Sequence, residues 1–257
     1  MRELTLLIDG DIVLFQASAA EEEKYDWQNG TSTVYSDPDR IMRIVRGSIN
    51  NLVVKLKATG VIVALSDPKK NFRKKILSTY KENRKGSTKP SGWAAARKLV
   101  EESNYRIYER PTLEGDDVMG ILATHPTLVP GKKIVVSIDK DMETVPCTWY
   151  NPNQSEKGPQ KIDEEQANWF HMFQTLTGDQ VDNYKGCPRI GPVKATDILE
   201  GLTDPADMWE AVVETYVTKG LTEDHALTQA RCARILRHTD YDFNKKEPIL
   251  WTPPKKT

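Results

Sequence analysis

The sequence lacks the residue patterns on which several classes of protein depend. Its three cysteines, Cys147, Cys187 and Cys232, are far apart and form no C-x-x-C pair, which argues against a disulfide framework and a zinc site. Its four histidines show no H-x-x-x-H spacing. No apolar run approaches the length of a membrane span, and no signal peptide is recognisable at Met1. These absences predict a soluble protein of a reducing cytoplasm.

The sequence also has little net charge, formally −1, but its charges are segregated. Between residues 69 and 98, eleven Lys and Arg stand against a single acid, Glu82. Phe72, Tyr80 and Trp93 are interleaved with these cations. A short charge run is often only a solvated face, whereas a long basic segment with aromatic side chains suits a polyanion whose bases can stack. The segment therefore predicts a contact with nucleic acid.

Three short apolar runs rich in β-branched residues predict buried strands, and each ends in acid. They read LTLLID up to Asp9, VIVALSD up to Asp67, and KIVVSIDKD, which contains Asp139 and ends at Asp141. Periodicity and end signals predict helices over 41–60, 91–103, 115–124, 163–177, 204–219 and 222–237. Alternating strands and helices predict an α/β protein with a mostly parallel central sheet flanked by helices. Ligands of such sheets gather beyond the carboxyl ends of the strands, where these acids would meet.

Two further clusters are acidic. LEGDDVMG sets Glu114, Asp116 and Asp117 at the start of an apolar helix, where one acid would serve as a cap but three repel one another. GDQVD places Asp179 and Asp182 three residues apart, on one face if the segment is helical. A Gly-x-Pro-x-x-Gly-Pro hairpin and a helix starting at Pro192 follow, and such a turn can present backbone amides to a phosphate.

These motifs together carry a family resemblance. LLIDGD, ALSDPKKNFRKKILSTYKENRKG, LEGDDVMG, SIDKD and GDQVDNYKGCPRIGPVKA, in this order and spacing, resemble the 5′-nuclease (flap endonuclease) superfamily. ARCARILRHTDYDF and PILWTP resemble the 5′→3′ exonucleases of short-tailed phages. The resemblance implies a PIN-like catalytic domain over 1–160 with a basic arch at about 69–98. It also implies a helical DNA-binding region over 161–257 with a helix-hairpin-helix (H3TH) motif at about 177–200. For a phage-encoded member the location would be the host cytoplasm.

The resemblance assigns nine acids to metal binding. Asp67, Glu114 and Asp116 would lie nearer one ion, and Asp139, Asp141, Asp179 and Asp182 nearer the other. Asp9 and Asp117 would act largely through bound water. Oxygen ligands without His or Cys select hard cations, so we expect two Mg²⁺, with Mn²⁺ as a substitute. Two such ions about 3.5–4 Å apart can hold the attacking and leaving oxygens of a phosphoryl displacement.

The resemblance also assigns a DNA grip. Tyr80, Lys81 and Arg84 match positions that hold the scissile nucleotide. Further DNA contacts are expected from Arg73, Lys74, Lys75, Lys85, Gly186, Arg189, Gly191 and Lys194. Relatives hold a potassium ion with the hairpin carbonyls, but Arg189 replaces the middle glycine of the usual Gly-x-x-Gly-Ile-Gly. A side chain there opposes a glycine-type backbone, and Arg189 would instead offer its charge to a phosphate.

The expected activity is hydrolysis of DNA phosphodiester bonds from or near a 5′ end, with structural rather than sequence selectivity. Digestion of duplex ends, cutting of 5′ flaps and removal of RNA primers from an RNA–DNA hybrid would all use this site. One alternative is a phosphatase of the haloacid-dehalogenase type, with Asp9 as nucleophile and Asp11 as acid, but it leaves the basic segment unexplained. Another is a DNA-binding relative without activity, although none of the nine acids is lost. A nucleotide binder would need a Walker-type or G-x-G-x-x-G loop, which is missing.

Overall fold

The computed structural model describes residues 3–27, 30–84, 86 and 88–255. Its centre is a six-stranded sheet in which every pairing is parallel except that of the last strand, β8, with β7. This confirms the predicted α/β class. In spatial order, the strands are β5 (Arg106–Glu109), β4 (Gly60–Leu65), β1 (Leu4–Asp9), β6 (Lys132–Val136), β7 (Cys147–Tyr150) and β8 (Gln160–Ile162).

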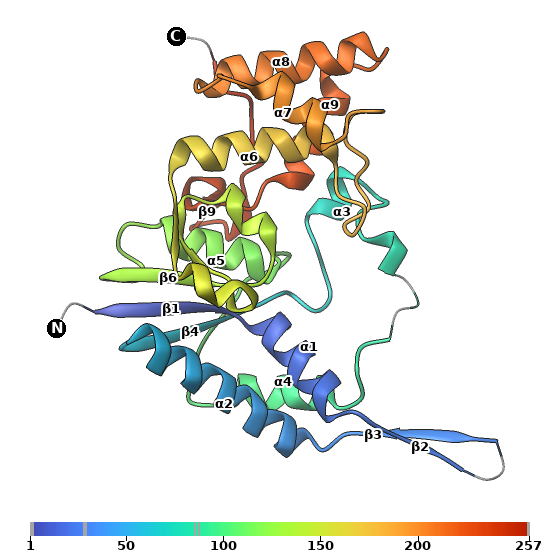
Figure 1. Cartoon of the computed structure of the whole chain (residues 1–257), viewed down its shortest axis with the longest axis vertical. Coiled ribbons are helices and arrows are strands. Elements are labelled where there is room, and N and C mark those ends of the chain that lie inside the picture. Colours follow the sequence, from blue (N-terminus) through green and yellow to red (C-terminus); the bar gives the residue numbers. More distant parts are fainter. Residues whose placement is uncertain (1–2, 28–29, 85, 87, 256–257) are drawn as a thin grey trace.

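Helices cover both faces of this sheet, because alternate side chains of the buried strands point to opposite sides. Leu6, Ile8 and Val63 pack with one set of helices, and Leu7 and Ile62 face the other side. The first face is covered by α1 (Gly10–Glu21), α2 (Pro38–Leu56) and α4 (Trp93–Glu101). The second is covered by α5 (Gly115–Thr124) (Figure 1). The carboxyl ends of β1, β4 and β6 therefore meet between two helical layers.

The C-terminal half of the chain forms a second, helical core above the sheet (Figure 1). Its helices are α6 (Glu164–Thr177), α7 (Pro192–Leu199), α8 (Pro205–Thr218) and α9 (Glu223–Ala233). After α9 the chain returns to the sheet, where Ile235, Leu236 and Tyr241 join the core around α5. The short elements η4 (His238–Asp240), β9 (Tyr241–Asp242) and β10 (Glu247–Pro248) follow. The domain boundary expected near residue 160 stays a prediction. The segment that returns after α9 packs into the core formed mainly by residues that precede this boundary.

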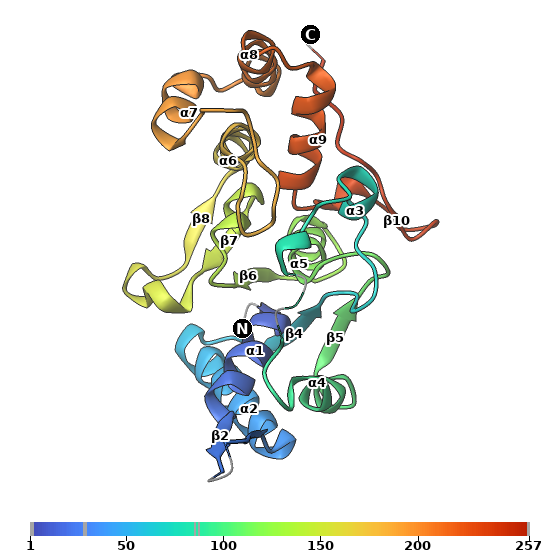
Figure 2. The ribbon, with the colours of Figure 1, turned by 90° about the vertical axis from the view of Figure 1, so that its right-hand side faces the viewer.

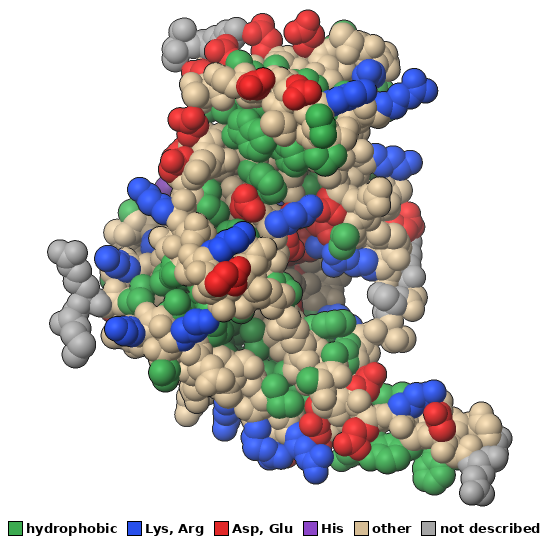
Figure 3. Space-filling model, in the orientation of Figure 1, with side chains coloured by type: hydrophobic (Ala, Val, Ile, Leu, Met, Phe, Trp, Pro, Cys, Tyr) green, Lys and Arg blue, Asp and Glu red, His purple; other side chains and the backbone are tan. Residues whose placement is uncertain are grey.

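Between β4 and α4 the chain forms an arc on one side of the molecule (Figure 1). It contains α3 (Arg73–Ile76) and η1 (Glu82–Arg84). Figure 3 shows an opening between this arc and the rest of the molecule. The arc corresponds to the basic segment that the sequence marks.

Several elements differ from the sequence expectations. An exposed antiparallel hairpin, β2 (Glu23–Asp26) and β3 (Ser32–Tyr35), was not anticipated, because its side chains face solvent and carry no core pattern. The elements η2 (Lys140–Thr144), η3 (Pro152–Lys157), β7 and β8 were also missed. The helix predicted over 222–237 ends at Ala233, since Arg234 has extended backbone angles. Within the described residues, no helix is long and apolar enough to cross a membrane.

Candidate active site

Acidic side chains from distant parts of the chain meet at the carboxyl edge of the sheet. Glu114 and Asp116 come from the start of α5, Asp139 and Asp141 from the loop after β6, and Asp182 from the loop after α6. All five line one small hollow, together with Arg73, Tyr80 and Lys81 from the arc. Figure 3 shows acidic side chains recessed among cationic ones on this side of the molecule. The sequence expectation that these acids converge is met by the fold.

Burial makes this cluster electrostatically costly without a cation. Asp9 is 5% exposed, and burial, with smaller contributions from Asp11 and Asp139, raises its pKa to about 7. Burial and then the charges of Asp139, Asp179 and Asp182 raise the pKa of Asp141 to about 7 as well. Burial likewise raises the pKa of Asp139. Crowded carboxylates of this kind favour either protons or metal cations.

The surroundings of Asp116 suit a bound cation. Burial, followed by the nearby Asp9 and Asp139, raises its pKa well above the usual range. Its oxygen Oδ1 is buried and accepts no hydrogen bond from the described residues. A buried polar atom without a partner costs free energy, so a hard cation fits here. Among the described residues, however, no group of three or more His, Cys, Asp or Glu side chains is placed so that it could hold a metal ion as it stands.

Glu114 differs from its neighbours because cations from the arc surround it. Lys81 Nζ donates a short hydrogen bond to its Oε1, and Arg73 Nη1 lies 3.1 Å from its Oε2. Tyr80 Oη lies 3.0 Å from the same Oε2. Burial alone would raise the pKa of Glu114, but the charges of Lys81 and Arg73 outweigh it and lower the pKa to about 2. Glu114 is therefore ionised at neutral pH.

Asp182 joins the same network from the opposite wall. Its oxygens accept hydrogen bonds from Tyr80 Oη at 2.6 Å and Arg84 Nη2 at 2.7 Å, and Lys81 Nζ lies 3.3 Å away. The Lys81 backbone has a φ of 54°, and its N–H donates to the Asp182 carbonyl at 2.9 Å. Tyr80, Lys81 and Arg84, the expected grip residues, are thus all brought to the acids. Arg84 is half exposed and faces solvent with part of its guanidinium.

The segment that carries Asp179 and Asp182 is a turn, which corrects the helical reading. Asp179 pairs with Tyr184 in a β-bridge, and its Oδ1 accepts hydrogen bonds from the backbone N–H groups of Val181 and Asp182. An aspartate that closes its own turn in this way is common in loops. The turn still directs both carboxylates toward the cluster, because both charges bear on the Asp141 pKa.

Asp117 and Arg73 have a different role from the one expected. Asp117 is fully buried, and Arg73 donates to its oxygens through Nη1 and Nη2, both at 2.7 Å. The backbone N–H groups of Glu114 and Leu236 donate to the same carboxylate. Arg73 is 3% exposed and also donates to the carbonyls of Cys232 and Arg234. Asp117 thus has no free lone pair aimed at the cluster, and Arg73 cannot reach DNA in this conformation.

Asp67 is also separated from the cluster. It lies beyond the end of β4, and its oxygens accept hydrogen bonds from the backbone N–H groups of Lys69, Lys70 and Thr112. Burial is the largest single influence and opposes ionisation, but the three backbone donors and the charge of Lys70 together outweigh it and lower the pKa of Asp67. It does not line the hollow that the other acids share. Its backbone N–H donates at 2.8 Å to the carbonyl of Leu113, the neighbour of Glu114, so Asp67 lies beside this segment while its carboxylate closes the loop. Its part in metal binding stays a prediction.

The hairpin after the acidic turn packs tightly against the end of α6. Gly186 has a φ of 65°, and a Cβ there would lie 2.3 Å from the Gly178 nitrogen. Its N–H donates to Gln229 Oε1 at 2.9 Å, so this buried amide is not available to a phosphate. Gly191, by contrast, is the exposed N-cap of α7, with the exposed Lys194 in its first turn. The hairpin therefore presents its second glycine and not its first.

Arg189 adopts the backbone that glycine would have there. Its φ is 64°, in the left-handed region that costs an L-residue roughly 1–2 kcal/mol. The side chain thus does not forbid the geometry, which corrects the reason given against a potassium site. Arg189 is exposed at the tip of the hairpin. Lys74 and Lys75 are exposed on α3, whereas Lys85 lies outside the described residues.

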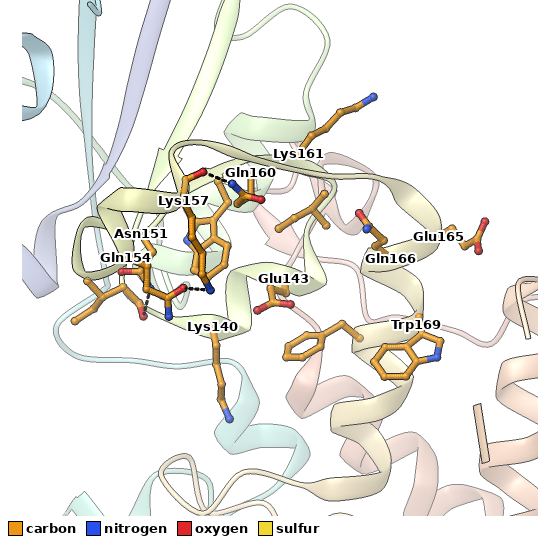
Figure 4. Close-up of a pocket in the computed structure, with 14 residues that line it drawn as sticks. Lys140, Glu143, Asn151, Gln154, Lys157, Gln160, Lys161, Glu165, Gln166 and Trp169 are labelled. Atoms are coloured by element: carbon orange, nitrogen blue, oxygen red, sulfur yellow. Dashed lines mark hydrogen bonds between the residues drawn. The ribbon is translucent and has the colours of Figure 1, made fainter. Parts of the chain in front are cut away.

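A second hollow of about 630 Å³ adjoins the acids on the side of β8 and α6 (Figure 4). Ile138 and Lys140, the neighbours of Asp139, line its edge, and Trp169 and Phe170 line another wall. The two aromatic residues are only partly buried. Figure 4 shows Glu143 between the lysine side chains and α6. The mixed charges of this hollow do not select one ligand.

Supporting residues of the site carried no sequence signal. Ser137 donates to Asp9 at 3.0 Å and Gln174 to Asp141 at 2.5 Å, so both fix the orientation of a carboxylate. The ring of Tyr184 stacks on Tyr80 at a centroid distance of 6.5 Å. Ser, Gln and Tyr occur throughout the chain, and only the three-dimensional arrangement distinguishes these three.

Comparison with known proteins gives a consistent result. A family model described as the 5′-3′ exonuclease N-terminal resolvase-like domain matches residues 4–166. The exodeoxyribonuclease of enterobacteria phage T3 is 31% identical over 96% of this chain and 92% of its own length. The exonuclease of Escherichia phage T7 is also 31% identical, over 96% of this chain and 93% of its own length. A flap endonuclease Xni of Shewanella halifaxensis is 24% identical over 93% of this chain and 94% of its own length.

Solved structures agree on the fold. The T5 D15 protein co-crystallised with metal ions superposes with a TM-score of 0.61 at 16% identity, covering 90% of this chain and 93% of that one. The bacteriophage T5 D15 flap endonuclease in a complex with DNA and metal ions gives a TM-score of 0.61 at 15% identity, with the same coverage. At such identities, the likeness concerns the fold.

Proposed function

The chain belongs to the 5′-3′ exonuclease family and is a 5′-3′ exodeoxyribonuclease/flap endonuclease, and on that premise we propose that it hydrolyses DNA phosphodiester bonds with two divalent cations, Mg²⁺ or Mn²⁺, at the acidic cluster. The observation that carries the proposal is the buried, partnerless oxygen of Asp116 among carboxylates whose pKa values are raised. Such a cluster gains stability when cations enter it.

The residues proposed to hold the ions are the acids that line the hollow, together with two acids whose charges act on them. They are Asp9, Glu114, Asp116, Asp139, Asp141, Asp179 and Asp182. All supply oxygen, which suits hard cations. When bound, the ions would acidify water and offset charge on the phosphoryl oxygens. Asp117 and Asp67 are left out of this set because neither lines the hollow, and Asp117 is fully buried in its pairing with Arg73.

Lys81 and Arg84 would hold the phosphodiester against these acids. In the structure, Lys81 forms ion pairs with Glu114 and Asp182, and Arg84 forms one with Asp182. An incoming phosphate and metal ions would compete for these contacts, leaving Lys81 Nζ free to stabilise charge that develops on the phosphoryl group. The Tyr80 hydroxyl lies within hydrogen-bonding distance of both Glu114 and Asp182 and so holds the two walls of the acidic hollow together.

The hairpin at 186–192 and the arc would place the DNA. We propose that Gly191, Lys194 and Arg189 contact duplex phosphates, since all three are exposed on one side of the cluster. Lys74 and Lys75 would contact the strand near the arc. Phosphate contacts carry no sequence information, so selectivity should follow the shape of the DNA end.

The test replaces two carboxylates one at a time. Asp116→Asn and Asp141→Asn should each abolish cleavage of a 5′-labelled duplex in Mg²⁺ while leaving DNA binding measurable. Near-normal turnover in both variants would remove the metal assignment. Labelled blunt, recessed, flapped and RNA-primed duplexes, with product sizes read on a gel, would then identify the preferred substrate.

A further inference from the structure

A basic groove lies behind the arc, separate from the acidic hollow. Its volume is about 690 Å³, within the range of ligand pockets. Four chain regions far apart in the sequence form it, namely α3 with its flanks, the loop after β5, the second half of α9, and the turn between β9 and β10 with the residues that follow it. Its lining residues are Phe72, Lys75, Ile76, Pro111, Thr112, Thr228, Arg231, Lys245, Lys246, Glu247, Pro248 and Leu250.

The groove is strongly cationic. Lys75, Arg231, Lys245 and Lys246 stand against a single acid, Glu247. Among the described residues, none of these four cations forms an ion pair within 4.0 Å. The three lysines are exposed. Asp242 lies close enough to Lys245 for the two charges to act on each other, but in the described part of the chain the other three cations have no such partner, so most of the positive charge is available to a ligand.

The groove also has apolar walls. Phe72 and Ile76 contribute from the arc, and Pro248 and Leu250 from the C-terminal segment. Arg231 Nε donates to the Trp251 carbonyl at 3.1 Å, which ties that segment to α9. Cations beside apolar surface suit a strand whose bases are unpaired, because a duplex presents phosphates but hides the faces of its bases.

The same two helices separate this groove from the acids. Arg73 of α3 and Cys232 of α9 line the acidic hollow, whereas Lys75 and Arg231 line the groove. In Figure 2, α7 lies to the left of α5, and α3 and β10 lie to the right. The hairpin proposed to hold duplex and the groove are thus on opposite sides of the cutting site. A strand that runs from the duplex past the acids and beyond α3 arrives at the groove.

From this arrangement we propose that the groove binds the unpaired 5′ part of the DNA substrate, on the far side of the scissile phosphate from the duplex. This inference rests on the proposed function, since it uses the proposed path of the strand. The groove adds affinity for substrates with a single-stranded 5′ extension and contributes nothing to blunt duplex ends.

The test is the double variant Lys245→Glu with Lys246→Asn. Both side chains are exposed, and Asn tolerates the left-handed backbone of Lys246, whose φ is 58°. The matched control is Lys132→Glu with Lys57→Asn. It changes the net charge equally, and Lys57 is also left-handed, with a φ of 54°. Lys132 begins β6, so this control lies toward the opposite end of the sheet.

Binding of a fluorescent oligothymidine and of 5′-extended duplexes is measured without divalent metal over a range of salt. The groove variant should bind the extended substrate about tenfold more weakly, with a salt slope lower by about 1.4 for two lost contacts. Its kcat on blunt duplex in Mg²⁺ should be unchanged. The control variant should match the wild type throughout.

Unchanged affinity in the groove variant, or an equal loss in the control, would overturn the groove assignment. So would stronger binding of poly-glutamate than of oligothymidine, which would point to an acidic protein segment. Failure of the wild type to cut any labelled DNA in Mg²⁺ or Mn²⁺ would instead refute the proposed function. The binding comparison distinguishes these cases because it needs no cleavage.

Discussion

Asp116 and Asp117 are neighbours in the chain but have opposite electrostatic surroundings. Asp116 faces other carboxylates and has a partnerless oxygen, whereas Asp117 accepts two hydrogen bonds from the Arg73 guanidinium and two from backbone N–H groups. The sequence analysis assigned both to metal binding, Asp116 near one ion and Asp117 largely through bound water. A one-residue step on a helix rotates the side chain by about 100°, so two adjacent acids point in different directions. The position of Arg73 decides which of the two carboxylates is paired with a cation inside the protein.

The same substitution at these two positions should therefore have opposite effects on stability. Asp117→Asn disrupts a buried ion pair and should cost about 3 kcal/mol or more in the free energy of unfolding. Asp116→Asn removes a charge from a repelling cluster and should cause no loss, or a gain, in metal-free protein. Urea unfolding at pH 8 with a chelator would measure both. Equal destabilisation would contradict the distinction between the two carboxylates.

A substitution of Lys81, also at the scale of single residues, tests its role in phosphodiester cleavage. Lys81→Ala should lower kcat by about 10²–10³, because one preorganised positive group near the reacting phosphoryl is lost. Lys57→Ala is the control, since it has the same left-handed φ of 54° and so the same backbone cost. A single-turnover assay with saturating Mg²⁺ would measure the step. An unchanged rate would contradict this role and would mean that Lys81 takes no part in the cleavage step.

At the scale of elements, the hairpin depends on close contact between two glycines. A Cβ at Gly186 would meet the backbone of Gly178 and Leu176 at 2.3–2.5 Å. Gly201 has a similar φ of 72° but open space around it. Gly186→Ala should therefore lose about 1–3 kcal/mol more stability than Gly201→Ala, from overpacking beyond the shared backbone cost. Paired thermal unfolding curves would measure the difference, and equal losses would mean that the hairpin can shift without cost.

Most strands and helices that bury apolar side chains could be predicted from the sequence, but α1, β5 and β7 were not, although each contributes to the core. β1, β4 and β6 have nearly continuous apolar patterns, and α5 spans the residues expected of it. The β2–β3 hairpin buries none of its described side chains, so periodicity cannot reveal it. The end of α9 was placed too late because Arg231, Arg234 and Arg237 share a helical spacing. Arg234 and Arg237 are instead buried in ion pairs with Asp240 and Glu164.

Across the whole molecule, the acidic cluster couples stability to pH and to metal. The pKa values of Asp9 and Asp141 are raised to about 7 from 3.8, so the folded state holds more protons than the unfolded state between about pH 4 and 7. The stability of metal-free protein should therefore fall as pH rises through that window. Glu114 acts in the opposite sense, but its pKa of about 2 confines its effect to pH below 4.5.

Mg²⁺ should reverse this trend. Cations displace protons from the cluster more readily at pH 8 than at pH 5, so the rise in Tm caused by Mg²⁺ should be larger at pH 8. Melting curves with Mg²⁺ and with a chelator at both pH values would measure it. Asp116→Asn should reduce the Mg²⁺ effect. A Tm rise independent of pH would mean that the ions bind elsewhere.

The return of the chain to the sheet after α9 has a consequence for biosynthesis. Arg73 donates to the carbonyls of Cys232 and Arg234, and Leu236 donates to Asp117, so the base of the arc is anchored by residues translated long after it. A ribosome-bound chain that has not yet released these residues lacks those anchors. The nuclease should consequently stay inactive on a nascent chain until residues 232–236 have left the ribosome.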